Sequence, residues 1–266
     1  MTFKHLCLDL DGTTLALKSD ITDFCSMVLS KVNESTKVIL VSARIPSGMI
    51  YIQEKIKAEG QPMICYNGAY ILDGERIIND QTIALDSVLK VYEICNSNSI
   101  AIGIYSYNDW WVPGDSERVQ KEIHNTKTHP AIEPTDVSLQ RLESNGKGVH
   151  KLMLMGTKET ADKAQKELEL LSKELTIYRS NDTLIEIAPS GIDKHRAIEM
   201  VVGNDLSQVM AFGDNFNDIE MVQNAGLGIA VANARESLKE VADALTLSCQ
   251  EDGVAHYLND YFKLGF

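Results

Sequence analysis

The stretch Phe3-Lys-His-Leu-Cys-Leu-Asp-Leu-Asp-Gly-Thr-Thr14 is an apolar run that ends in two carboxylates one residue apart and then a glycine. We interpret it as a β-strand whose C-terminal end carries chemistry. Alternate side chains of a strand share a face, so Asp9 and Asp11 start out side by side, and a turn at Gly12 lets Asp11 rotate away while staying close. Two close carboxylates repel unless a cation or a proton lies between them.

Two other interpretations of this stretch exist. A plain strand followed by a polar turn already accounts for Asp-Gly, so other segments must decide whether the carboxylate pair has a function. A calcium loop fits poorly. In the register that begins at Asp9, Thr14 stands where the sharp-turn glycine should be and Asp20 stands where the bidentate glutamate should be.

The composition is that of a water-soluble globular protein. The 266 residues suffice for one large α/β domain or two moderate ones, with 44% hydrophobic and 24% charged residues. No apolar run approaches the ~20 residues that cross a bilayer, and no signal peptide is recognisable, so we expect a cytoplasmic protein with no membrane partner. Five scattered cysteines without a Cys-x-x-Cys pair predict reduced thiols rather than disulfides or a zinc site.

The net charge of -13 restricts the partners of the chain. Nucleic-acid binding needs a basic face, so we expect no nucleic-acid partner, and no protein partner is evident. If the substrate is an anion, the site must reverse the field locally with a metal ion, a lysine or backbone N–H groups.

Strand and helix patterns alternate along two separate parts of the chain. Residues 3–66 have the order strand, helix, strand, helix, strand, and the alternation resumes from Pro189. This order predicts an α/β fold with a doubly wound, mainly parallel (Rossmann-like) core. Residues 82–186 instead show paired antiparallel strand patterns and helices, which predict an inserted α+β cap domain. The catalytic core would then comprise residues 1–81 and 187–266.

Polar side chains cluster where the predicted core strands end. In open parallel sheets that edge binds ligands, because strand ends and helix N-termini converge there. Three carboxylates among them suit a hard octahedral cation, so we expect Mg²⁺. The residues at strand ends are Asp9, Asp11, Ser42, Asn67 and Asp214, with Lys194 at the start of a helix.

Four of these segments together resemble the motifs of the haloacid dehalogenase (HAD) superfamily in order and spacing. They are Asp-Leu-Asp-Gly-Thr13, the strand-end Ser42, Gly-Ile-Asp-Lys194 and Gly-Asp-Asn-Phe-Asn-Asp218. The position of the insert after the third core strand is similar to that in the Cof-type (HAD-IIB) branch of small-molecule phosphatases. So are Asn67-Gly-Ala-Tyr-Ile71, Gly228-Ile-Ala-Val-Ala-Asn-Ala234 and Glu251-Asp-Gly-Val254. The resemblance covers essentially the whole core.

The resemblance implies a role for each motif residue. Asp9 would be the nucleophile that forms an aspartyl phosphate, and Asp11 would be the general acid and then the general base. Asp214 would hold Mg²⁺ together with the side chain of Asp9 and the carbonyl of Asp11. The groups that would bind the phosphoryl group are Ser42, Lys194 and Asn217.

Four further residues allow two interpretations each. Asp218 is either a metal ligand or a residue that orients the site or caps the helix it begins. Arg44 and Asn67 either contact the substrate or cap, or brace loops. Glu186 stands where the chain returns to the core, and we favour a structural role for it.

Trp110 and Trp111 are adjacent on a predicted strand, so one must point to each face and at most one could stack on a substrate. We expect the other to pack in the core. Two positions depart from the family pattern. Ser42-Ala-Arg44 replaces the commoner Thr-Gly-Arg, and His195 replaces a small residue after Lys194.

The resulting hypothesis is a Mg²⁺-dependent phosphatase that hydrolyses a small phosphorylated metabolite, most plausibly a sugar phosphate. One alternative is a sugar phosphomutase that uses the same aspartyl phosphate. The other is a non-catalytic binder of phosphorylated metabolites, which would need no nucleophile.

Overall fold

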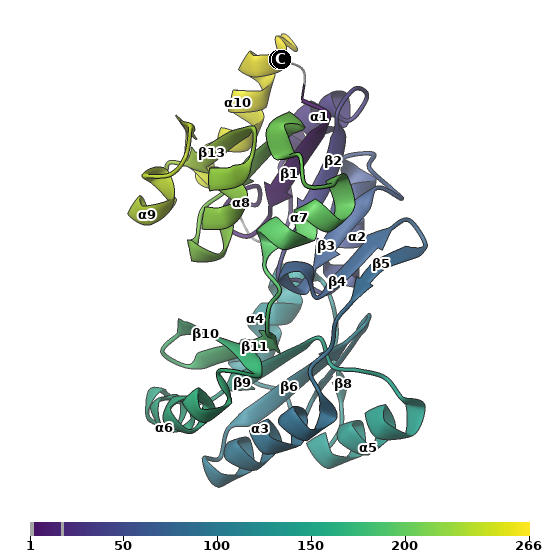
Figure 1. Cartoon of the computed structure of the whole chain (residues 1–266), viewed down its shortest axis with the longest axis vertical. Coiled ribbons are helices and arrows are strands. Elements are labelled where there is room, and N and C mark those ends of the chain that lie inside the picture. The colour runs from purple at the N-terminus through teal and green to yellow at the C-terminus, as the bar shows by residue number, and fades with distance from the viewer. Residues whose placement is uncertain (1–2, 17–18) are drawn as a thin grey trace. The chain divides into compact units, whose positions relative to one another are not determined.

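The chain divides into two compact units in the computed structural model, which describes residues 3–16 and 19–266. The core unit comprises Met1–Asn79 and Asp193–Phe266, and the insert unit comprises Asp80–Ile192. Each unit contains one sheet (Figure 1).

The core unit is built on an eight-stranded sheet in the order β14-β13-β12-β1-β2-β3-β4-β5. Every neighbouring pair from β14 to β3 is parallel, and β4 returns antiparallel to β3. The predicted doubly wound, mainly parallel α/β core is therefore confirmed. The strands are β1 (His5–Asp9), β2 (Lys37–Val41), β3 (Pro62–Cys65), β4 (Tyr70–Asp73), β5 (Arg76–Asp80), β12 (Val209–Gly213), β13 (Leu227–Val231) and β14 (Ala244–Thr246).

Two pairs of helices pack against each other in the core unit. In the first helix the hydroxyl of Thr22 caps the N-terminus by accepting the N–H of Cys25, and the apolar residues at helical spacing are buried. This helix packs on the last one, and α7 packs beside α8 (Figure 1). The helices are α1 (Asp23–Val32), α2 (Ser47–Lys55), α7 (Lys194–Val202), α8 (Ile219–Asn224), α9 (Glu236–Lys239) and α10 (Gly253–Phe262).

Successive strands are added to the sheet on opposite sides of β1 before and after the insert, although all of them run parallel to β1 as far as β3 and β14. From β1 the chain proceeds to β2 and β3 on one side, and after the insert it proceeds from β12 to β13 and β14 on the other. A crevice forms at the carboxyl ends of the strands at such a switch point, where ligands bind. Asp9 ends β1 and Asp214 follows β12, so both carboxylates stand at this point.

The insert unit holds a six-stranded sheet in the order β10-β11-β9-β6-β7-β8, antiparallel except for the last pair. The strand that spans the predicted boundary at residue 187 continues to Pro189. That the insert selects the substrate stays a prediction. The strands are β6 (Ala101–Ser106), β7 (Asp109–Val112), β8 (Ala131–Ile132), β9 (Lys151–Met155), β10 (Leu175–Asn181) and β11 (Leu184–Pro189). The helices are α3 (Leu85–Ser97), α4 (Glu117–Thr126), α5 (Thr135–Asn145) and α6 (Lys158–Leu168).

The two tryptophans of β7 have different environments. Trp111 belongs to the apolar cluster that β6, β9 and β11 form with α3, α5 and α6. Trp110 stacks on Tyr105 with ring centroids 5.2 Å apart. The predicted core packing of one member is confirmed, and the other is buried too, since 2% of Trp110 and 7% of Trp111 is exposed.

Two further features agree with the composition. All five cysteines are buried free thiols. Among residues 3–16 and 19–266, no helix combines the length and apolarity that a membrane span requires.

Candidate active site

Asp9 is the most buried acid of the β1 segment, with 5% of its surface exposed. Its Oδ1 accepts a hydrogen bond of 2.6 Å from Lys194 Nζ, whereas its Oδ2 is buried and meets no donor among the described residues. Burial, and then the nearby charge of Asp218, raise the pKa of Asp9 well above its ordinary value, although Lys194 opposes the shift. The free oxygen thus lies in a site that favours a bound cation or electrophile.

Lys194 links two carboxylates inside the core unit. Its ammonium is 2.6 Å from Asp9 Oδ1 and 2.5 Å from Asp218 Oδ1, and only 1% of the residue is exposed. Burial acts to lower the pKa of Lys194, but Asp218 and Asp9 outweigh it and hold that pKa above its ordinary value. Lys194 is therefore a fixed positive charge in the site.

Asp218 has partners for both of its oxygens. Oδ1 accepts from Lys194, and Oδ2 accepts the backbone N–H groups of Asp214 and Asn215, each at 3.0 Å. The carboxylate thus points back into the loop after β12 and does not cap α8. This arrangement favours the orienting interpretation of Asp218 over direct metal ligation.

Asp214 completes a group of three acids. Asp9, Asp214 and Asp218 each offer an oxygen, and these oxygens all lie within 4.8 Å of one another. Burial and the charge of Asp218 raise the pKa of Asp214 to about 6. Three carboxylates around one ammonium leave an excess of negative charge, so the donor set fits a hard divalent cation.

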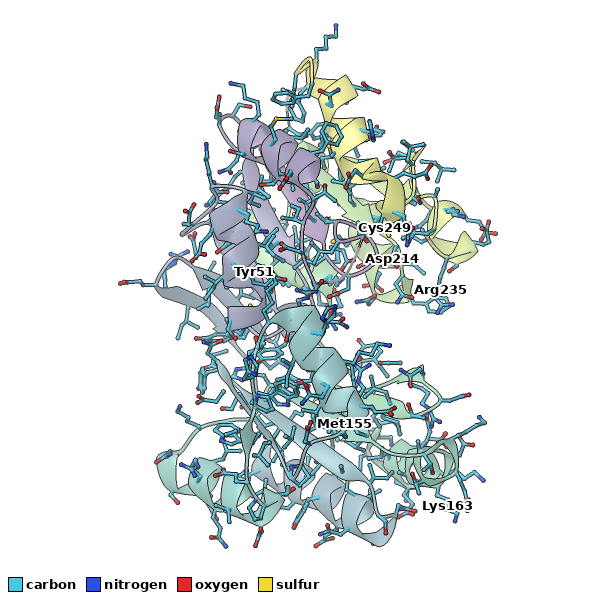
Figure 2. All side chains as sticks on the ribbon, turned by 180° about the vertical axis from the view of Figure 1, so that it is seen from behind. Tyr51, Met155, Lys163, Asp214, Arg235 and Cys249 are labelled. Atoms are coloured by element: carbon cyan, nitrogen blue, oxygen red, sulfur yellow. The ribbon has the colours of Figure 1, made fainter. Side chains whose placement is uncertain are left out.

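Asp11 is held by Arg44. The Nε and Nη2 atoms of the guanidinium each donate a 2.8 Å bond to one oxygen of Asp11. Arg44 is 3% exposed and also donates to the carbonyl of Gly48 and the hydroxyl of Tyr51 on α2 (Figure 2). These contacts favour a bracing role for Arg44, which holds the predicted acid/base residue Asp11 in position.

The remaining predicted residues lie around the ends of β2 and β3. Ser42 is buried, and its Oγ accepts the N–H of Arg44 at 3.3 Å. Asn67 has a left-handed backbone with φ of 56°, donates its N–H to the carbonyl of Ser42, and accepts a 3.2 Å bond from Asn217 Nδ2. The structure thus links Ser42, Asn67 and Asn217, which are far apart in the sequence.

Glu186, for which the sequence favours a structural role, lies on β11 in the insert unit and pairs with Lys151 at 3.4 Å. Lys151 and then Ser180 lower the pKa of Glu186 against the effect of burial. These contacts agree with a structural role.

Sequence reasoning assigned no role to three side chains that position the loop after β1. Thr14 Oγ1 donates to the carbonyl of Asp9 at 2.6 Å, and Thr13 Oγ1 donates to Asp214 at 3.3 Å. Asn233 Nδ2 donates to the carbonyl of Gly12 at 2.8 Å. All three lie in the stretches quoted above, so their place in those stretches is the sequence signal that could have indicated a role. The contact between Asn233 and Gly12 is evident only from the fold.

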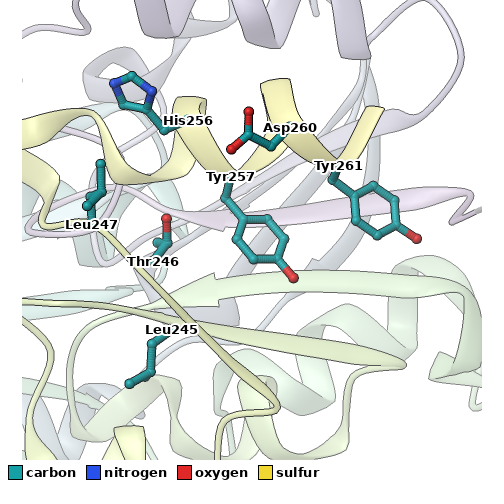
Figure 3. A pocket seen from close by; sticks show the side chains of 7 residues that line it. All are labelled: Leu245, Thr246, Leu247, His256, Tyr257, Asp260 and Tyr261. Atoms are coloured by element: carbon teal, nitrogen blue, oxygen red, sulfur yellow. The ribbon is translucent and has the colours of Figure 1, made fainter. Parts of the chain in front are cut away.

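A different pocket, of about 640 Å³, lies between β14 and α10 (Figure 3). It contains one carboxylate and none of the predicted site residues, so we do not assign the chemistry to it. Its lining residues are Leu245, Thr246, Leu247, His256, Tyr257, Asp260 and Tyr261.

Known proteins resemble this chain over nearly its full length. The model of the haloacid dehalogenase-like hydrolase family matches residues 6–258. A 5-amino-6-(5-phospho-D-ribitylamino)uracil phosphatase of Bacillus subtilis is 26% identical, with 97% of each chain covered. The crystal structure of a haloacid dehalogenase-like hydrolase from Bacteroides thetaiotaomicron has a TM-score of 0.89 at 27% identity, covering 98% of this chain and 100% of that one. A sugar phosphatase of HAD subclass IIB shares the fold, with a TM-score of 0.79 at 24% identity over 98% of this chain and 99% of its own.

Proposed function

The chain belongs to the haloacid dehalogenase-like hydrolases, and from this premise we propose that it is a Mg²⁺-dependent phosphatase of the HAD-IIB group that hydrolyses small phosphomonoesters through an aspartyl phosphate on Asp9. The coarser part of this statement, a phosphatase of small phosphorylated substrates, rests on family membership. The metal, the covalent intermediate and the substrate class rest on the site.

The observation that carries the proposal is the state of the Asp9 carboxylate. Lys194 fixes one of its oxygens, and the other is buried at the switch point of the sheet and meets no donor among residues 3–16 and 19–266. A purely structural buried carboxylate would have both oxygens satisfied. A nucleophile instead needs one oxygen oriented and one free to attack.

Mg²⁺ would be held by Asp9, Asp214 and the carbonyl of Asp11, with Asp218 orienting the loop. When bound, the cation would neutralise charge on the phosphoryl oxygens and keep the Asp9 carboxylate ionised. The pKa of Asp214 near 6 fits this assignment, because carboxylates crowded without a cation retain protons.

The first half-reaction forms a bond between an Asp9 oxygen and phosphorus and breaks the bond from phosphorus to the leaving oxygen. Asp11 gives its proton to that oxygen, which leaves as an alcohol. In the second half-reaction Asp11 takes a proton from water, whose oxygen attacks the aspartyl phosphate. Inorganic phosphate leaves and Asp9 returns as a carboxylate. The charge on the transferred group would be met by Lys194 and by hydrogen bonds from Ser42 and Asn217.

The Arg44 fork has a consequence for Asp11. Both oxygens of Asp11 accept from the guanidinium fork of Arg44, an arrangement that suits the charged form of a carboxylate. To act as an acid, Asp11 must give up one bond of the fork and take up a proton. Arg44 is then a positioning residue, because its hydrogen bonds set the orientation of the Asp11 carboxylate in the two half-reactions.

The proposed substrate is a sugar phosphate or a similar phosphorylated polyol. The relative from Bacillus subtilis acts on a phosphorylated ribitylamino compound, and the structural neighbour of subclass IIB is a sugar phosphatase. Both names describe small polyhydroxylated phosphomonoesters, and this shared chemistry is what we transfer to the chain.

The test is phosphate release from a panel of phosphomonoesters with and without Mg²⁺, for the wild type and for Asp9→Asn. We expect activity only with the metal, and a loss of at least ~10³-fold in the variant, because a nucleophile has no substitute within the site. Asp260→Asn, which changes an exposed carboxylate on α10 of the same unit, is the matched control and should keep full activity.

Four results would contradict the proposal. Undiminished turnover by Asp9→Asn, or turnover without metal, would remove the assigned mechanism. Movement of phosphate between sugar positions without net release would identify a phosphomutase. Tight binding of sugar phosphates without turnover would identify a binding protein.

A further inference from the structure

The first turns of α7 and α8 carry a second group of metal-ligating side chains. Asp193, His195 and Glu220 each offer one ligand atom, and the three atoms lie within 4.8 Å of one another. None of them belongs to the proposed catalytic group. His195 is also the residue that stands where the family usually has a small side chain, and the proposed phosphatase mechanism gives it no task.

Contacts within α7 orient Asp193 and His195, whereas the Glu220 side chain on α8 is exposed. Asp193 is the N-cap of α7, and its Oδ1 accepts the N–H of Arg196 at 2.8 Å. Its Oδ2 is 3.4 Å from Arg196 Nε, but that arginine side chain is 60% exposed, so a divalent cation can displace this weak ion pair. His195 is 19% exposed, with Nε2 at 3.9 Å from Glu199 Oε1.

The spacing between the two helices is set independently of these three residues. Lys194 lies between Asp193 and His195, and Asp218 lies two residues before Glu220. The buried Lys194–Asp218 ion pair of 2.5 Å therefore fixes the backbone on which all three ligands stand. A site whose ligands are already brought together loses little conformational entropy when an ion binds.

The donor set discriminates between cations. One imidazole nitrogen and two carboxylate oxygens suit Zn²⁺ and its neighbours in the first transition series, whereas Mg²⁺ prefers oxygen donors alone. We propose that Asp193, His195 and Glu220 form a second, transition-metal site for an ion such as Zn²⁺, with water as the fourth ligand. The strongly negative net charge of the chain favours any such cation.

The bound ion would join the start of α7 to the start of α8, which the Lys194–Asp218 pair joins in the buried interior. It would therefore stabilise the core unit in proportion to its occupancy. This consequence does not depend on whether the phosphatase proposal is correct.

The experiment is a titration of the full chain with Co²⁺, a spectroscopic substitute for Zn²⁺, with Mg²⁺ present in excess. The protein used carries Asp214→Asn, which weakens the catalytic carboxylate group as a competing site. We expect one Co²⁺ per chain, with the visible absorption of a four-coordinate ion and a raised thermal midpoint of unfolding.

Variants at the ligands decide whether the ion occupies the proposed position. His195→Gln and Glu220→Gln, each in the Asp214→Asn background, should weaken Co²⁺ binding by at least ~10-fold, since even loss of an outer-shell partner costs ~10–100-fold. His124→Gln, an exposed histidine on α4 of the insert unit, is the matched control and should bind as before.

Unchanged affinity in both ligand variants would overturn the proposal, as would displacement of Co²⁺ by the excess of Mg²⁺. Loss of the ion in the His124→Gln control would also overturn it. Because the readouts are absorption, stoichiometry and thermal stability, the result is independent of any enzymatic activity.

Discussion

Replacing Lys194 by methionine should destabilise the core unit strongly, because the change removes a buried charge and leaves its partners behind. Lys194 is 1% exposed, and its partners Asp9 and Asp218 are 5% and 0% exposed. Removing one member of a buried ion pair costs ~3–5 kcal/mol, a large share of the ~5–15 kcal/mol by which domains are stable. Taking ~4 kcal/mol and a urea dependence of ~2 kcal/mol per molar, the urea midpoint should fall by ~2 M.

The assay is urea unfolding at pH 7, followed by far-ultraviolet circular dichroism. Lys163→Met serves as the control, because Lys163 is on the surface of α6 in the insert unit (Figure 2), and its ion pair with Glu159 is exposed. That variant should unfold at the wild-type midpoint. If Lys194→Met unfolds within ~0.3 M of the wild type, the two carboxylates do not depend on the ammonium, and our account of the site is wrong.

A second test of the same reasoning is the double variant Lys194→Met with Asp218→Asn. The second change removes one of the two unpaired charges, so it should recover part of the lost stability. A double variant that is less stable than Lys194→Met would mean that Asp218 stabilises the fold mainly through its two backbone hydrogen bonds and not through Lys194.

Four further predictions follow from individual contacts. Gly12→Ala should raise the Mg²⁺ concentration for half-maximal activity by ~10-fold, because a Cβ on Gly12, whose φ is 95°, would lie 2.5 Å from Asp214 Oδ2; an unchanged metal requirement would contradict this. Arg44→Lys should lower kcat by ~10²-fold with little change in KM, because an ammonium cannot hold Asp11 by a two-bond fork; steady-state kinetics would show this, and unchanged kcat would refute it. The Mg²⁺ concentration for half-maximal activity should rise by ~10-fold per pH unit below ~6, because Asp214, with its pKa of about 6, then retains a proton that Mg²⁺ must expel. A Mg²⁺ concentration that stays constant between pH 4.5 and 7 would rule this out. Burial lowers the pKa of His150 below its ordinary value, so the stability of the insert unit should be complete above pH ~6.5 and decline as the pH falls, and His150→Gln should flatten this decline in tryptophan-monitored unfolding.

The sequence by itself determined the class of the fold and the edge at which the candidate site lies. Buried parallel strands are continuous apolar runs, and each ends abruptly in a polar residue, so β1, β2 and β12 can be recognised without coordinates. Because parallel strands share a direction, Asp9, Ser42 and Asp214 had to meet at one edge. The same local rules predicted different environments for Trp110 and Trp111, since alternation along a strand is a property of the backbone.

Only the tertiary structure decided what each polar group binds. The resemblance implied an acid/base role for Asp11 and did not decide between two roles for Arg44. The fold places the Arg44 guanidinium on both oxygens of Asp11. Asp218 allowed a ligand or an orienting role, and the structure favours the orienting one because Lys194 and two backbone N–H groups engage its oxygens. Such choices depend on side-chain directions and on distances between segments that are more than 200 residues apart, such as Thr13 and Asp214. No local pattern of propensity or spacing encodes those distances, because they arise when the whole sheet closes around β1.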